Sequence, residues 1–213
     1  MQQMTEEMRE IMDAEDLKKA EYRELAAKIM VFARDQIMIS MRFLDRALFR
    51  MPMVPAETVA TYGVNGQVIY YNVDHVLYSF KQEKNRCTRA FLHMIFHCIF
   101  SHPFQYEKMD RQCWDFACDL AVEKSILDLH LGDTRLDSDS DREKILEKYE
   151  EEVPVLTAEN IYHFLRKNPD RAEEWLAQAE LFEQDDHIHW IPKKEVDAAD
   201  RTGDTITTDT RTA

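Results

Sequence analysis

Residues 89–103 read RAFLHMIFHCIFSHP, and this segment decides how the rest of the chain is interpreted. Apolar residues occupy nearly every side of the helix that it predicts, so we expect this helix to be buried all round. His93 and His97 lie four positions apart on it. At about 100° per residue these positions differ by only about 40° around the helix axis, so both imidazoles face the same way.

Two buried imidazoles on one helix face have two explanations. A buried ring needs partners, and a pair that converges on one point suits a tetrahedral zinc site. Alternatively, each histidine is an ordinary core residue whose ring nitrogens bond to a carbonyl or a carboxylate. The segment by itself leaves both interpretations open.

The elements before this segment are predicted to be long helix and then hairpin. Residues 5–50 contain neither Gly nor Pro, and their apolar residues recur with a period close to 3.6, which predicts one long helix or two helices end to end. Residues 58–64 and 67–72 are rich in Thr, Val, Ile and Tyr, and Asn65-Gly66 between them predicts a two-residue turn.

Helices are predicted through most of the remaining chain. Asn72 or Asp74 would cap a helix after the hairpin, and Thr157 would cap a later one. Residues 133–141 are expected to form a polar loop. The other predicted helices span about residues 86–101, 111–131, 143–149, 157–167 and 171–182.

The fold class is therefore α+β and mostly helical. It combines a long N-terminal helix, a small β-hairpin or sheet and a buried helix that bears the histidines. Residues 1–192 are expected to form one domain, and residues 193–213, rich in Asp and Thr, a flexible tail.

Composition limits the classes of partner. The 213 residues include 27 Lys and Arg against 41 Asp and Glu, a formal charge of −14. A surface this acidic repels phosphate backbones and anionic membranes, so we expect neither as a partner. The first twenty residues are charged throughout and show no signal peptide, and the four cysteines form no C-x-x-C pair. Reduced thiols in a cytoplasmic protein are the expected state.

Three motifs together resemble a bacterial family of putative metallopeptidase domains. They are LHMIFHCIFSHPF at residues 92–104, WDFACDLAVE at 114–123 and DDHIHW at 185–190. The resemblance covers about residues 10–192 in the order of its elements, and it implies a zincin-like fold with bound Zn²⁺. It also implies association with a von Willebrand A-like domain, which this chain lacks, and with MoxR-type AAA ATPases.

One position departs from the zincin pattern. In H-E-x-x-H enzymes the glutamate after the first histidine is the general base for the metal-bound water. That position is Met94 here, and a thioether cannot take a proton. General acid–base help typically contributes about 10²–10⁴-fold to a rate. The site is therefore either degenerate or uses a carboxylate from elsewhere. Glu123 is the candidate for that carboxylate, but a solvated helix position is the preferred interpretation of Glu123.

The resemblance leaves two candidates for a third metal ligand. Asp119 is flanked by apolar residues on the next predicted helix, which is where zincins with a carboxylate ligand place it. His102 would join His97 only if the helix breaks just before it, which Ser101 and Pro103 favour. Asp119 is preferred, and its alternatives are a role as acceptor for His93 or His97 or a structural ion pair.

The last motif contains Asp186, His187 and Trp190, which match a D-H-x-x-W signature of the resembled family. We expect Trp190 to pack this segment onto the core, with its polar groups capping it, rather than to find a metal ligand here. Cys98 points about 100° away from His97 and is interpreted as a small core residue.

Three functions follow from these patterns. The first is a zinc peptidase without the standard glutamate, whose strand at residues 67–72 pairs with an extended peptide. The second is a pseudo-peptidase scaffold that keeps its metal and binds a peptide or a partner ATPase. The third is a helical adaptor without metal. The missing glutamate favours the second over the first, and the retained histidines argue against the third.

Overall fold

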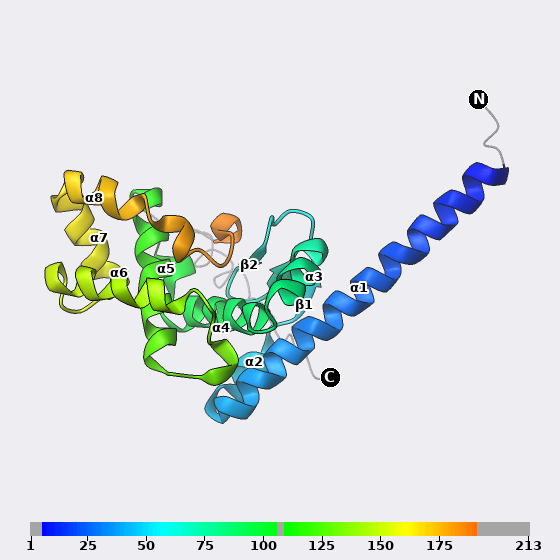
Figure 1. The fold of residues 1–213 in the computed structure, drawn as a ribbon, viewed down its shortest axis with the longest axis horizontal. Coiled ribbons are helices and arrows are strands. Elements are labelled where there is room, and N and C mark those ends of the chain that lie inside the picture. Colours follow the sequence, from blue (N-terminus) through cyan, green and yellow to red (C-terminus); the bar gives the residue numbers. More distant parts are fainter. Residues whose placement is uncertain (1–5, 106–108, 191–213) are drawn as a thin grey trace, which may run out of the picture.

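The computed structural model describes residues 6–105 and 109–190 (Figure 1). This part of the chain is mostly helical with one small three-stranded sheet, so the predicted α+β class is confirmed. The domain boundary predicted at residue 192 and the tail at residues 193–213 lie outside the described residues.

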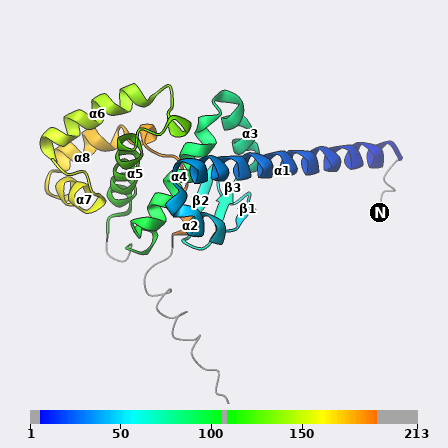
Figure 2. The ribbon, with the colours of Figure 1, turned by 90° about the horizontal axis from the view of Figure 1, so that it is seen from below.

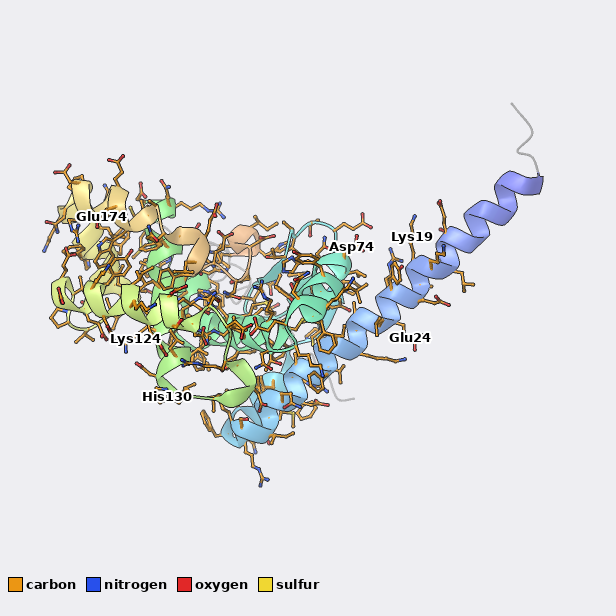
Figure 3. All side chains as sticks on the ribbon, viewed as in Figure 1. Lys19, Glu24, Asp74, Lys124, His130 and Glu174 are labelled. Carbon is orange, nitrogen blue, oxygen red and sulfur yellow. The ribbon has the colours of Figure 1, made fainter. Side chains whose placement is uncertain are left out.

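The N-terminal helix projects from the body of the domain. In Figures 1 and 2 the first part of α1 (Glu6–Ser40) extends away from all other elements, and Lys19 and Glu24 point into solvent from it (Figure 3). The later part of α1 is embedded because apolar residues at helical spacing face the core. These buried residues are Ala26, Ile29, Met30, Ala33 and Ile37.

The prediction of helices end to end is confirmed at the end of α1. Met41 leaves the helical conformation, with φ −133° and ψ 64°. A short 3₁₀ turn, η1 (Arg42–Leu44), and then α2 (Asp45–Arg50) continue the chain.

The sheet contains one strand more than the predicted hairpin. Strands β2 (Tyr62–Val64) and β3 (Ile69–Tyr71) pair antiparallel, as predicted, but are shorter than expected. Strand β1 (Met53–Pro55) pairs parallel with β3, so the order is β1-β3-β2. Because β3 is the central strand, the expectation that residues 67–72 pair with a substrate peptide is wrong.

The hairpin turn lies one residue later than predicted. Asn65 N–H donates to the Val68 carbonyl at 3.3 Å, which makes Gly66 and Gln67 the central residues. The Asn65 side-chain oxygen also accepts from Gln67 N–H and Val68 N–H. Gly66 has φ +85°, a left-handed conformation that glycine adopts without a Cβ penalty.

Two helices follow the sheet. Asn72 caps α3 (Val73–Gln82) by accepting from His75 N–H at 3.1 Å, which decides between the two predicted caps. The histidine-bearing helix is α4 (Asn85–Ile99), and it is buried along nearly its whole length, as predicted. Ser101 then adopts a left-handed conformation, φ 63°, and starts the 3₁₀ turn η2 (His102–Phe104).

The second half of the described chain is helical. Asp110 caps α5 (Arg111–Asp128), and Thr157 caps a later helix as predicted. The predicted loop at 133–141 contains a 3₁₀ turn and the start of a helix, because that helix is longer than the predicted 143–149. The elements after α5 are η3 (Gly132–Thr134), α6 (Asp139–Glu152), α7 (Ala158–Lys167), α8 (Pro169–Leu176), η4 (Ala179–Leu181) and η5 (His187–His189).

Two hydrophobic clusters flank the centre of the domain. The first cluster joins α1, α2, the sheet, α3 and α4, and includes Phe91 and Met94. The second cluster joins α5 to α8 and includes Trp114 and Trp175. Helix α4 packs against α5 between them, so side chains on their facing sides are removed from water.

Within the described residues, no helix is long and apolar enough to cross a membrane. The four cysteines are free thiols, and three of them are buried.

Candidate metal centre

His93 and His97 lie side by side on α4 and are completely buried. Their ring centroids are 4.5 Å apart. The Nε2 atoms of both rings lie 3.2 Å from the same oxygen, Oδ1 of Asp119 on α5. The i, i+4 spacing therefore directs both imidazoles to one point, as the sequence predicts.

A second carboxylate enters this point from the C-terminal segment. Asp185 Oδ1 lies 3.4 Å from His93 Nε2 and 3.6 Å from His97 Nε2. One ligand atom from each of His93, His97, Asp119 and Asp185 lies within 4.8 Å of the other three. All four residues are buried, and three separate segments of the chain supply them.

Several of these atoms lack the partners that buried polar atoms normally have. Neither His97 Nε2 nor either oxygen of Asp185 makes a hydrogen bond with the described part of the chain. A buried polar atom without a hydrogen bond costs free energy. A cation among these atoms would satisfy them together, so the group fits a metal ion.

The far side of each imidazole is also occupied. His93 Nδ1 lies 2.8 Å from Glu123 Oε1, and a neutral His93 that donates its Nδ1 proton there has an unprotonated Nε2. His97 Nδ1 lies 2.9 Å from His102 Nδ1, and one of these atoms must donate to the other. When His97 donates, its Nε2 is also left unprotonated, which is the form that binds metals.

Glu123 is a buried partner of His93 and does not occupy a solvated helix position. Its carboxylate accepts three hydrogen bonds from the Arg89 guanidinium, at 2.7–3.2 Å. Arg142 lies 3.5 Å from the same carboxylate. Because Glu123 contacts the Nδ1 edge of His93, it lies away from the Nε2 atoms, which is a poor location for the substitute base considered above.

His102 follows the helix break that the sequence indicates, but it lies behind His97. The left-handed Ser101 turns the chain so that His102 meets the Nδ1 edge of His97. Asp119 lies beside the opposite edge of the His97 ring, which carries Nε2. This arrangement makes His102 a partner of His97 and leaves Asp119 as the third member of the group.

Met94, which follows His93 directly, is fully buried within the first cluster. Cys98 packs against the same cluster, and burial raises the pKa of its thiol to about 12. A protonated thiol is a poor ligand, which agrees with the interpretation of Cys98 as a core residue.

In the metal-free protein at pH 7 the group combines two ionised carboxylates with a protonated His93. Burial raises the pKa values of the Asp119 and Asp185 carboxyls, but His187 and the other imidazoles outweigh it and hold both below the ordinary range. Burial and the neighbouring His93 lower the pKa of His97 to about 4, so this ring is neutral at pH 7. In the tautomer that donates Nδ1–H to His102, His97 Nε2 is unprotonated and faces the ionised Asp119 at 3.2 Å, and two acceptors this close repel unless a cation lies between them.

Residues Asp185–Trp190, called here the closing segment, cover the group from outside. The Trp190 ring is buried, stacks on His187 with centroids 3.7 Å apart, and contacts His97 edge-on at 5.1 Å. The packing role expected of Trp190 agrees with this placement. The structure differs from the expectation that this segment supplies no candidate metal ligand, because the Asp185 carboxylate lies beside both imidazoles.

Asp185 was not identified from the sequence because nothing in its surroundings marks it as buried. Gln184 and Asp186 flank it, whereas apolar residues flank Asp119. His187 is also close: its Nε2 lies 3.0 Å from Asp119 Oδ1, and its Nδ1 lies 3.3 Å from Asp115 Oδ1.

Comparison with known proteins gives one match. No curated protein matches the chain, and no solved structure does. The model of the family described as putative metallopeptidase domain matches residues 28–211, which include all four members of the candidate metal group. The chain therefore belongs to the putative metallopeptidase domain family.

Proposed function

We propose that this domain binds one zinc ion through His93, His97, Asp119 and Asp185. The observation that carries the proposal is the convergence of four ligand atoms from three segments, all within 4.8 Å of one another. Zn²⁺ prefers four nitrogen, sulfur or oxygen ligands in tetrahedral geometry, and two imidazoles with two carboxylates supply such a set. The orphaned atoms on His97 and Asp185 support an ion rather than a hydrogen-bonded core.

We further propose that the centre is catalytically degenerate. A zinc ion with an open ligand position polarises a carbonyl and acidifies water, whereas structural sites are closed by four protein ligands. Asp185 provides the fourth ligand here. Met94 cannot serve as a base, and Arg89 and His93 engage Glu123 on the far side of the ring.

The same observations favour a non-enzymatic scaffold over an active peptidase. A closed metal centre between two hydrophobic clusters stabilises the domain without requiring turnover. In this function the domain keeps the peptidase architecture and presents its surface to a peptide or protein partner.

Elemental analysis of the untagged protein tests the metal proposal. We expect one equivalent of zinc in the wild type and none in His97→Ala. The ligands left in this variant are one imidazole and two carboxylates, which should hold zinc weakly. His163→Ala is the matched control, since His163 is exposed on α7. A metal-free wild type, or a His97→Ala protein that retains one equivalent, contradicts the proposed site.

Peptide cleavage tests the degeneracy separately. The zinc-loaded wild type should cleave unstructured protein no faster than the His97→Ala variant does. Zinc-dependent cleavage that is lost in His97→Ala would establish an active peptidase and refute the degenerate centre, while leaving the metal site intact.

A further inference from the structure

The free edge of strand β2 is covered by the chain itself. In the order β1-β3-β2, β2 has one edge that is not paired with β3. Asp186 forms an isolated parallel bridge with Gly63 on that edge, and its N–H donates to the Tyr62 carbonyl at 2.7 Å. The closing segment therefore lies where an added strand would lie.

The Asp186 side chain fastens the segment next to this edge. Its carboxylate accepts from the backbone N–H groups of Ala60 and Thr61 and from the Thr61 hydroxyl. Hydrogen bonds to a charged acceptor are among the stronger ones in proteins. Asp186 thus holds the segment without itself belonging to the metal group.

The same segment separates the imidazoles from solvent. A cavity of about 340 Å³ reaches Asp119, Asp185 and His187, but His93 and His97 do not line it. Asp185 and His187 line that cavity and also lie next to the rings on α4: Asp185 Oδ1 is 3.4 Å from His93 Nε2, and the His187 and His97 ring centroids are 5.0 Å apart. Pairing at the β2 edge and closure of the metal group are therefore produced by adjacent residues of one segment.

We propose that the β2 edge is a polypeptide-binding edge whose occupant is the closing segment, and that this segment must leave before the metal centre exchanges ligands. The proposal rests on the proposed function, because it assigns Asp185 to the metal. Extended chains bind exposed sheet edges through main-chain hydrogen bonds, and the bridge from Asp186 to Gly63 has this form. Departure of the segment frees the β2 edge and removes Asp185 from the imidazoles in a single local opening.

The rate of zinc release to an excess of a chromogenic chelator tests this coupling in the full-length, zinc-loaded protein. Asp186→Ala removes the acceptor for Ala60 and Thr61 and leaves the four ligands in place. We expect release to be about tenfold faster or more, because the loss of charge-assisted hydrogen bonds favours the open segment. Asp186→Asn keeps an acceptor oxygen and should give an intermediate rate.

Two controls make the outcome decisive. Asp74→Ala makes the same chemical change at an exposed position on α3 (Figure 3) and should release zinc at the wild-type rate. Thr61→Val removes only the hydroxyl donor to Asp186 and serves as a second variant if Asp186→Ala does not fold; it should accelerate release by a smaller factor.

Failure of this inference and failure of the proposed function give different results. One equivalent of zinc in the wild type, with equal release rates from wild type, Asp186→Ala and Thr61→Val, overturns the gating role and leaves the metal site standing. A wild type that holds no zinc overturns both the proposed function and this inference.

Discussion

The Nδ1 atom of His93 lies 2.8 Å from Glu123 Oε1, so a carboxylate on α5 fixes which ring edge of a histidine on α4 faces the metal group. Glu123 is itself held by Arg89, whose guanidinium is buried beside it. A carboxylate in this position orients the imidazole and increases its basicity.

Glu123→Ala should therefore weaken zinc binding by about 10–100-fold. It should also lower the free energy of unfolding by about 3–5 kcal/mol, because Arg89 is left buried without its main partner. Glu123→Gln keeps an oxygen acceptor for His93 Nδ1 and should recover part of the affinity. Competition with a chelator measures the first effect, and urea unfolding measures the second.

Asp128→Asn is the control for the Glu123 variants. It removes an exposed carboxylate on the same helix, where the pair with Lys124 contributes at most about 1 kcal/mol. Wild-type zinc affinity in Glu123→Ala would show that His93 needs no support from this carboxylate.

Met94→Glu, which places a carboxylate directly after His93, should destabilise the domain. Met94 is fully buried in the first cluster, and an unpaired carboxylate there costs several kcal/mol or takes up a proton. Met94→Leu preserves the volume and should cost less than about 1.5 kcal/mol. Urea unfolding of both variants compares them; equal stabilities would mean that a carboxylate at residue 94 finds a polar partner.

The stability of the metal-free protein should fall between pH 6.5 and pH 9. Burial lowers the pKa of His93, but Asp119 and Glu123 outweigh burial and raise it to about 9. A folded-state pKa above the ordinary 6.5 adds stability that is complete below pH 6.5 and is lost as pH rises through 9. Urea unfolding at several pH values measures this slope.

Zinc should reverse that dependence, because the His93 Nε2 proton must leave before the atom binds a metal. The affinity for zinc should therefore rise towards pH 9, with release of a proton. A zinc affinity that is independent of pH between 6.5 and 9 would argue against His93 as a ligand.

Gly66→Ala should destabilise the hairpin and its contact with η2. Gly66 has φ +85°, and a Cβ atom there would collide with the Phe104 ring. The strained backbone alone costs about 1 kcal/mol. Gly132→Ala is the control, since an added Cβ meets nothing within 4 Å there. Thermal unfolding should show a lower midpoint for Gly66→Ala only.

The sequence was informative wherever the signal is local. The period of residues 5–50, the caps at Asn72 and Thr157, and the buried helix with paired histidines all depend on neighbours in the chain, and the structure contains each of them. The shared face of His93 and His97 follows from helix periodicity and the burial of Asp119 from its apolar flanks, whereas the placement of Asp119 beside the imidazoles was implied only by the family resemblance.

The misses concern pairings between distant segments. Glu123 is buried because Arg89, on another helix, neutralises it, and no local pattern reports that partner. Polar residues flank Asp185 in the sequence, and Asp185 is buried because its neighbour Asp186 pairs with β2. Strand β1 is not among the predicted strands because prolines at positions 52 and 55 argue against a strand, although Pro55 fits the end of an edge strand.

The candidate ligands come from three segments that are far apart along the chain, and its cysteines form no disulfide. An ion bound among them would act as an internal cross-link between α4, α5 and the closing segment. Such a cross-link limits the conformations of the unfolded chain and so contributes through loop-closure entropy as well as through its own bonds. Removing the ion would then loosen three distant segments at once.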